Sequence, residues 1–198
     1  MEHKNVSLSI FNAFKHLTTH TSKQQRCYSF DAANLARIQE ITDSNTLSHY
    51  FEADHKRLDL FAEQFSHYLM ILPQLASRYF TAFAQGLTAH IVAEETVLFP
   101  FFEEKTGLQQ GPTVTMRQEH QQIITILSLI SEKLAQQHYQ IAAEYNQLNQ
   151  LLARHNKREE NILYPMLDQH SNDQEKAELF LKLFEATALP HCGPCAAN

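Results

Sequence analysis

A repeated pattern constrains the fold of this chain more than any other feature of its sequence. Residues 90–100 read HIVAEETVLFP, and residues 155–165, which follow 65 positions later, read HNKREENILYP. The histidine, both glutamates, the leucine and the proline recur in register. His55 and His120 are separated by the same 65 positions, and each follows an acidic residue. One unit, a histidine followed 35 positions later by His-x-x-x-Glu, therefore occurs twice.

Composition and apolar spacing predict an all-α protein. Glycine is scarce, with 4 residues among 198, and apolar residues recur at steps of three and four. These stripes predict long helices at about 46–71 and 73–99 in the first repeat, and from Thr113 to Leu134 and Ile141 to Met166 in the second. Short turns within each repeat favour an up-down-up-down four-helix bundle.

The chain divides into three predicted parts. Residues 46–169 form the bundle, and residues 1–45 form an N-terminal helical extension with a short apolar pattern. Residues 170–198 contain a further helix that begins at Asp173, followed by a tail with Cys192 and Cys195. This cysteine pair has the spacing of a redox motif, but no βαβ pattern surrounds it, so a metal-binding tail, a redox-sensitive disulfide and a tail without function all remain open.

Helix geometry predicts that six polar residues meet at one level of the bundle. In an antiparallel hairpin, residues equidistant from the turn lie at the same height, because both helices rise equally per residue. The midpoints of the two histidine pairs fall after residues 72 and 137, where the two turns are expected. The midpoint between Glu94 and His120 falls at Gly107, in the connection between the repeats. The converging residues are His55, His90, Glu94, His120, His155 and Glu159.

Other polar residues near this level are expected to lie outside the site. Asp54 and Glu119 each precede a converging histidine and are turned about 100° from it on a helix. Asp59, four residues after His55, is expected to face solvent, the alternatives being a hydrogen-bond acceptor behind a ligand or an extra ligand. On the last helix, the apolar stripe continues beyond Glu159 to Ile162, which is expected to face inward.

Two carboxylates and four imidazoles inside an apolar bundle favour a metal site. Burying such charges without strong partners costs several kcal/mol each. Zinc alone would use four of the six donors, whereas two ions that share the two glutamates use all six and keep open positions. This donor set suits iron better than manganese or zinc. A bundle without metal, in which the histidines are hydrogen-bonded core residues, is the alternative.

With these motifs the chain resembles the hemerythrin-like, or HHE cation-binding, family. The resemblance covers residues 46–169 and implies a four-helix bundle with two iron ions joined by an oxo or hydroxo bridge. It implies that the four histidines are terminal ligands and that Glu94 and Glu159 bridge the ions. Oxygen-carrying hemerythrins have a fifth histidine four positions after the one that corresponds to His120. Here Ile124 stands at that position, which makes reversible oxygen carriage a weaker expectation.

The expected function is binding of oxygen, nitric oxide or peroxide at open iron positions, in sensing, scavenging or stress defence. Repair of damaged iron centres by iron donation and turnover as a nitric oxide reductase or peroxidase are the alternatives. A net charge of −6 without basic runs argues against a nucleic-acid partner, and no apolar run is long enough to cross a membrane. Without a signal-peptide pattern in residues 1–21, a cytoplasmic location is expected. The oligomeric state stays open.

Overall fold

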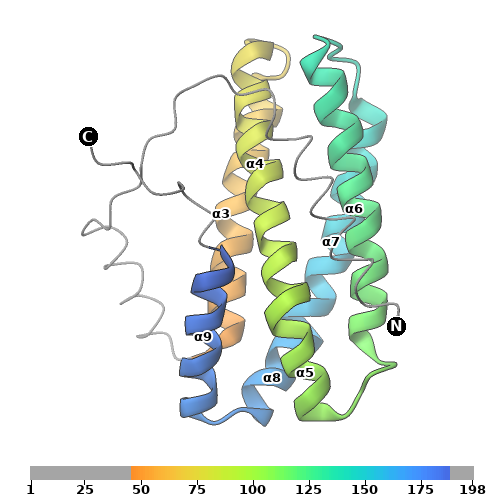
Figure 1. The fold of residues 1–198 in the computed structure, drawn as a ribbon. Coiled ribbons are helices and arrows are strands. Elements are labelled where there is room, and N and C mark those ends of the chain that lie inside the picture. Colours follow the sequence, from red (N-terminus) through yellow and green to blue (C-terminus); the bar gives the residue numbers. More distant parts are fainter. Residues whose placement is uncertain (1–45, 188–198) are drawn as a thin grey trace, which may run out of the picture.

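The computed structural model describes residues 46–187, and all regular structure within this range is helical (Figure 1). The prediction of an all-α protein is confirmed for these residues. The predicted N-terminal extension, residues 1–45, and the tail with Cys192 and Cys195 lie outside the described residues.

Each repeat contains two long helical rods, and the second rod of each passes through a π-helical turn. The elements of the first repeat are α3 (Leu47–Tyr68), α4 (Pro73–Ala93), η1 (Glu94–Leu98) and α5 (Phe99–Thr106). Those of the second are α6 (Pro112–Ala135), α7 (Ala142–Arg158), η2 (Glu159–Leu163) and α8 (Tyr164–His170), followed by α9 (Asp173–Thr187). The π-helical turns η1 and η2 begin at equivalent positions of the repeat, Glu94 and Glu159.

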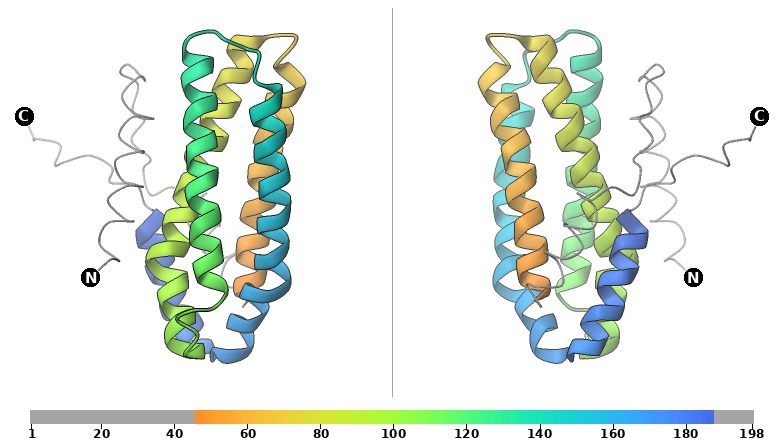
Figure 2. Two further views of the ribbon diagram at one scale, coloured as in Figure 1. Left: turned by 90° about the vertical axis from the view of Figure 1, so that its right-hand side faces the viewer. Right: turned by 90° about the vertical axis from the view of Figure 1, so that its left-hand side faces the viewer.

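The long helices α3, α4, α6 and α7 lie side by side and alternate in direction (Figures 1 and 2). This arrangement agrees with the predicted bundle. Contacts of α4 with α6 and of α3 with α8 join the two repeats, and α9 packs outside against α4 and η1. In residues 46–187, no helix combines the length and the apolar character needed to cross a membrane.

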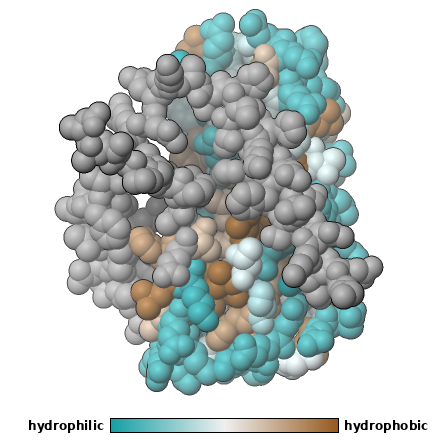
Figure 3. All heavy atoms as spheres, in the orientation of Figure 1, coloured by the Kyte–Doolittle hydropathy of each residue, from teal (hydrophilic) through white to brown (hydrophobic). Residues whose placement is uncertain are grey.

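The interior contains two hydrophobic clusters, one on either side of the histidine level. The first includes Phe65, Phe80 and Leu127, and the second includes Phe102 and Leu167. On the face drawn in Figure 3, the coloured side chains are mainly hydrophilic, with hydrophobic ones gathered in the lower part of the view. The two clusters hold the four rods together above and below the polar level, so the positions of the polar side chains are fixed by packing.

The rod that begins with α4 is longer than predicted. It was expected to end near Phe99, but it continues through Pro100 to Thr106. Proline lacks an N–H group, and its ring clashes with the carbonyl of the preceding turn in a regular α-helix. The wider π-turn η1 ends two residues before Pro100 and accommodates the ring, as η2 does two residues before Pro165. At its end, α5 stops at Gly107, whose φ of 70° lies in the left-handed region.

The π-turn η2 also changes which residues of the second rod face inward. Ile162 was predicted to be buried, but it is 47% exposed, whereas Leu163 and Tyr164 are buried. A π-turn takes up one more residue than an α-turn, so the buried face moves forward by one position. The prediction for Ile162 was wrong because it assumed an unbroken α-helical period.

The beginning of α3 is capped by a residue from the other repeat. The carboxylate of Asp168 in α8 accepts hydrogen bonds from the backbone N–H groups of Leu47 and Ser48, at 2.8 and 3.0 Å, and from the Ser48 hydroxyl at 2.7 Å. Helix N-termini leave N–H groups unpaired and favour negative charge. This cap fixes the first helix of the bundle against the end of the last.

Candidate metal centre

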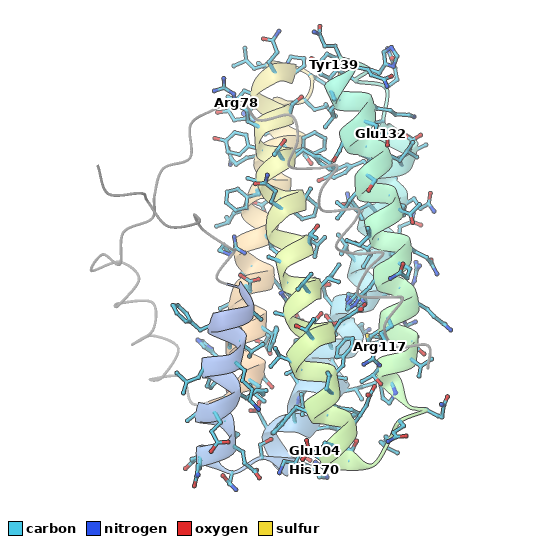
Figure 4. All side chains as sticks on the ribbon, in the orientation of Figure 1. Arg78, Glu104, Arg117, Glu132, Tyr139 and His170 are labelled. Atoms are coloured by element: carbon cyan, nitrogen blue, oxygen red, sulfur yellow. The ribbon has the colours of Figure 1, made fainter. Side chains whose placement is uncertain are left out.

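The six residues predicted to converge are brought together and buried. Each is at most 4% exposed, and the two glutamates are fully buried. In Figure 4, Arg117 of α6 lies nearer to the end marked by Glu104 than to the end marked by Tyr139. His120 follows Arg117 by three residues in α6, so the polar level lies toward that end of the bundle. The six residues are His55 in α3, His90 in α4, Glu94 in η1, His120 in α6, His155 in α7 and Glu159 in η2.

The histidines form two pairs whose Nε2 atoms face each other. Nε2 of His55 lies 3.2 Å from Nε2 of His90, and Nε2 of His120 lies 3.1 Å from Nε2 of His155. Each pair joins the two rods of one repeat. Both pairs therefore present their Nε2 atoms to the centre of the bundle.

Each of the two glutamates reaches histidines of both repeats. Glu94 Oε2 lies 3.3 Å from His120 Nε2 and 3.6 Å from His90 Nε2. Glu159 Oε1 lies 3.0 Å from His155 Nε2, and its Oε2 lies 3.6 Å from His55 Nε2. The two carboxylates thus lie between the histidine pairs, where each can present its two oxygens to different neighbours.

A ring of four further carboxylates contacts the opposite nitrogens of the histidines. Nδ1 of His90 lies 3.0 Å from Asp54, and Nδ1 of His155 lies 3.1 Å from Glu119. Nδ1 of His120 lies 2.9 Å from Glu95. In the same way, Glu160 lies 2.8 Å from Nδ1 of His55. An ionised carboxylate only accepts hydrogen bonds, so each Nδ1 carries the proton and, in the neutral imidazole, Nε2 keeps its lone pair for a metal.

This ring corrects the prediction that Asp54 and Glu119 lie outside the site. Their rotation of about 100° from the adjacent histidine points each of them to the histidine of the neighbouring helix instead. The repeat itself carried a signal for the ring, because Asp54 and Glu119 are 65 positions apart, as are Glu95 and Glu160.

Arginines hold two members of this ring in place. Arg57 donates to Asp54 at 2.7 Å, and Arg158 donates to Glu119. Burial alone would raise the pKa of Asp54, but His90 and Arg57 together hold it well below its usual range. Arg158 and His155 likewise lower the pKa of Glu119 against the opposing effect of burial. Both carboxylates are therefore ionised at neutral pH and can orient their histidines.

Comparison with known proteins decides the family. The family model described as the hemerythrin HHE cation-binding domain matches residues 46–167, which is more than half of the chain. The chain belongs to this family. The match begins with the cap of α3 and ends in α8, so all six central residues and the four outer carboxylates lie within the hemerythrin HHE domain.

Curated relatives include proteins named iron-sulfur cluster repair protein YtfE from Salmonella paratyphi B, Salmonella newport and Salmonella heidelberg. Each is 27% identical over 104 residues, which cover 48% of this chain and 47% of the relative. The chain thus spans about half the length of the curated relatives it matches. No solved structure matches the chain with comparable significance.

A tyrosine of the hemerythrin HHE domain breaks the symmetry of the site. The hydroxyl of Tyr164 donates a hydrogen bond to Glu94 Oε1 at 2.8 Å and lies 3.2 Å from Glu159 Oε2. The equivalent residue of the first repeat is Phe99, which has no hydroxyl and stacks on His120 with ring centroids 5.4 Å apart. Burial raises the pKa of Tyr164 well above its usual value, and both glutamates add to this, so the phenol keeps its proton.

Within the centre, the buried carboxylates and the histidines stabilise each other's charged forms. Burial alone would raise the pKa of Glu94, but the charge of His90 and the approach of His120 lower it to about 2. Burial disfavours the charged form of His120, but Glu94 and Glu95 raise its pKa to about 9. Without a metal, the raised pKa values of His90 and His120 favour protons on these two histidines, which compensate the buried carboxylates, and a bound cation would replace these protons.

Two buried carboxylate oxygens without hydrogen-bond partners, called the orphaned oxygens below, indicate that the site fits a metal cation. Glu94 Oε2 and Glu159 Oε1 are buried and accept no hydrogen bond from any residue in the range 46–187, although both lie close to histidine Nε2 atoms. Unpaired buried carboxylate oxygens are costly, and a cation removes this cost. Two sets of residues could each hold a cation, because the donor atoms within each set lie within 4.8 Å of one another. One set is Glu94, His120, His155 and Glu159, and the other is His55, His90 and Glu159. Asp59 is exposed, as predicted, and belongs to neither set.

Proposed function

We propose that this hemerythrin HHE protein holds two iron ions at the centre of its bundle. His55 and His90 would be the terminal ligands of one ion, and His120 and His155 those of the other. Glu94 and Glu159 would bridge the pair, because each lies within 4 Å of histidines from both repeats. The orphaned oxygens of these two glutamates are the observation that carries the proposal.

Iron is favoured over manganese and zinc by the donor set and by its arrangement. Four imidazoles and two carboxylates are donors that suit iron, and two ions sharing two carboxylates leave each ion with positions free for a further ligand. When bound, the iron pair would supply open coordination positions and a change of oxidation state. The chain itself fixes the donors through the outer carboxylates and excludes water with Phe51 and Phe99, which are at most 1% exposed.

We infer that the protein binds oxygen, nitric oxide or peroxide at these positions, in sensing, scavenging or stress defence in the cytoplasm. Ile124 stands four positions after His120, and its hydrocarbon side chain offers no donor atom to a metal. This residue therefore supports a coordination position on the iron that no protein ligand fills. A less saturated iron pair is more reactive toward small ligands than one with a fifth histidine.

The second candidate function is repair of damaged iron centres by donation of iron. The names of the curated relatives favour it, since these proteins are described as iron-sulfur cluster repair proteins. The tail residues Cys192 and Cys195 would be suitable for passing iron to an acceptor, because thiolates bind iron well. The remaining alternative is an enzyme that turns over nitric oxide or peroxide, and the rapid-mixing experiment below distinguishes it from stoichiometric binding.

Iron loading tests the metal site directly. Protein loaded with ferrous iron without oxygen and then desalted should retain two irons per chain, measured by elemental analysis. Folded protein that retains no iron would refute the site, and a helical circular dichroism spectrum would establish that the protein is folded. Loading in parallel with manganese and zinc tests the preference for iron.

Rapid mixing and an acceptor assay then separate the functions. Mixing the iron-loaded protein with oxygen, nitric oxide or peroxide distinguishes one stoichiometric reaction from repeated turnover. For donation, an iron–sulfur acceptor protein lacking its cluster is incubated with the loaded protein, sulfide and reductant, and cluster formation is followed by absorbance. Replacing Cys192 and Cys195 by serine should abolish donation and leave ligand binding intact if the tail passes on the iron.

A further inference from the structure

The two halves of the centre differ in ways that the repeat does not predict. One half contains His55 and His90, and the other contains His120 and His155. Each bridging glutamate approaches a histidine of the second half more closely than one of the first: Glu94 lies 3.3 Å from His120 and 3.6 Å from His90, and Glu159 lies 3.0 Å from His155 and 3.6 Å from His55. If both halves hold an ion, the two glutamates are therefore placed less closely around the ion of the first half.

The hydroxyl of Tyr164 adds to this difference. It contacts Glu94 Oε1 and Glu159 Oε2, and the second of these oxygens faces His55. The ring of Tyr164 lies 6.1 Å from the ring of His55, so the phenol is on that side of the centre. A carboxylate oxygen that accepts a hydrogen bond is a weaker donor to a metal than a free one, because its lone-pair density is partly withdrawn.

Among residues 46–187, no hydroxyl makes a hydrogen bond to the carboxylate oxygens nearest the opposite half. The two carboxylate oxygens without hydrogen-bond partners lie nearest to His120 and His155, at 3.3 and 3.0 Å. Phe99, the counterpart of Tyr164, stacks its hydrocarbon ring on His120. The carboxylate oxygens that face this half therefore keep their full donor strength.

Access to water differs in the same direction. The side chain of Glu160, which contacts His55, is 36% exposed. Its repeat counterpart Glu95, which contacts His120, is 8% exposed. Water and small chelating groups therefore approach the His55 side of the centre more closely than the His120 side.

We propose that the two metal positions are unequal, that the position at His55 and His90 releases its ion first, and that the Tyr164 hydroxyl is the residue group that weakens it. This inference rests on the proposed two-ion site. A two-ion site with unequal positions would have one ion that exchanges and one ion that is retained. The retained ion would keep the histidines and glutamates of the other half in place while the first is exchanged.

Release of iron to a chelator tests the inequality. Protein loaded with two ferrous irons per chain is mixed without oxygen with an excess of a chromogenic ferrous chelator, and absorbance is followed over time. Two phases, each equal to one iron per chain, are expected. Binding of fewer than two irons by the wild-type protein would refute the proposed function, whereas two irons leaving in a single phase would refute only this inference.

Variants at the two equivalent aromatic positions test the role of the hydroxyl. Tyr164→Phe should slow the fast phase by about tenfold, because a hydrogen bond to a charged oxygen is worth at least about that factor in an equilibrium constant. Phe99→Tyr should speed the slow phase, because it places a hydroxyl at the other half. Unchanged rates in Tyr164→Phe would refute the role of the hydroxyl. If that variant fails to fold, an unchanged slow phase in Phe99→Tyr would refute it instead.

Single-histidine variants assign the phases to the halves. His90→Ala should lose the fast phase and keep one slowly released iron, and His155→Ala should lose the slow phase. The opposite pattern would overturn the assignment of the exchangeable position. Circular dichroism and thermal unfolding of each metal-free variant establish that the fold is unchanged.

Discussion

The outer carboxylates offer a strong test of the site because they contact no proposed ion themselves. Glu119→Ala should weaken binding of the ion at His155 by about 10–100-fold, which corresponds to about 1.4–2.7 kcal/mol. Glu119 is the hydrogen-bond partner of His155 Nδ1, at 3.1 Å. Without it, the imidazole is no longer held in the tautomer and orientation that direct the Nε2 lone pair to the centre. Arg158 loses its partner too, but at 42% exposure it can be solvated instead.

A graded series separates charge from geometry at this position. Glu119→Gln keeps an oxygen that can accept from His155 Nδ1 but removes the negative charge. Charge-assisted hydrogen bonds are roughly twice as strong as neutral ones, so the loss of affinity should be smaller than for alanine. Asp54→Asn, at the equivalent position of the first repeat, should have a similar effect on the ion at His90.

Competition with a chelator of known affinity measures these effects on anaerobic protein. Glu144→Gln is the matched control, because Glu144 pairs with Lys133 away from the centre. The control should bind metal like the wild type. If Glu119→Ala binds both ions within a factor of about two of the wild type, the contribution assigned to the outer carboxylate is refuted.

Three further predictions concern the bridging residues, the metal-free protein and the core. Glu94→Ala and Glu159→Ala should each retain at most one iron, and elemental analysis showing two would contradict the bridging roles. Without metal, His120, with its pKa raised from 6.5 to about 9, contributes stability that is complete below pH 6.5 and is lost as pH rises through about 9. Glu94, with its pKa lowered from 4.5 to about 2, contributes stability above pH 4.5 that is lost as pH falls toward 2. The urea midpoint of the metal-free protein should therefore be highest between pH 4.5 and 6.5, and a rise from pH 7 to 9 would contradict this. Phe65→Ala, at a fully buried position, should lower the free energy of unfolding by about 3–5 kcal/mol, whereas Leu60→Ala, 60% exposed, should leave it nearly unchanged in urea unfolding.

The convergence of the central residues was predictable because it depends on long-range regularity. Equal rise in paired helices makes residues equidistant from a turn level, and the turns were recognisable from Pro73 and from the polar stretch near Gln137. The histidines and glutamates of both repeats were accordingly found at one level, buried as the apolar stripes required.

The outer carboxylates were missed because the prediction considered one helix at a time. Asp54 does point away from the direction of its neighbour His55, as the helix period requires. Its partner is His90 on the adjacent helix, and the rotation of two helices about their own axes does not follow from the period of either one. Similarly, Ile162 was misplaced because a π-turn changes the period locally. Pro165, three residues later, was the sequence signal for that irregularity.

The Asp168 cap gives the protein a built-in reporter of events near the centre. Asp168 lies nine residues after Glu159, yet it holds the amide protons of Leu47 and Ser48, more than a hundred positions away in the sequence. Loosening of α8, which follows the bridging Glu159, would release these two amides to exchange with solvent deuterium. Hydrogen exchange at the start of the first bundle helix therefore measures how firmly the end of the second repeat is held, with and without metal.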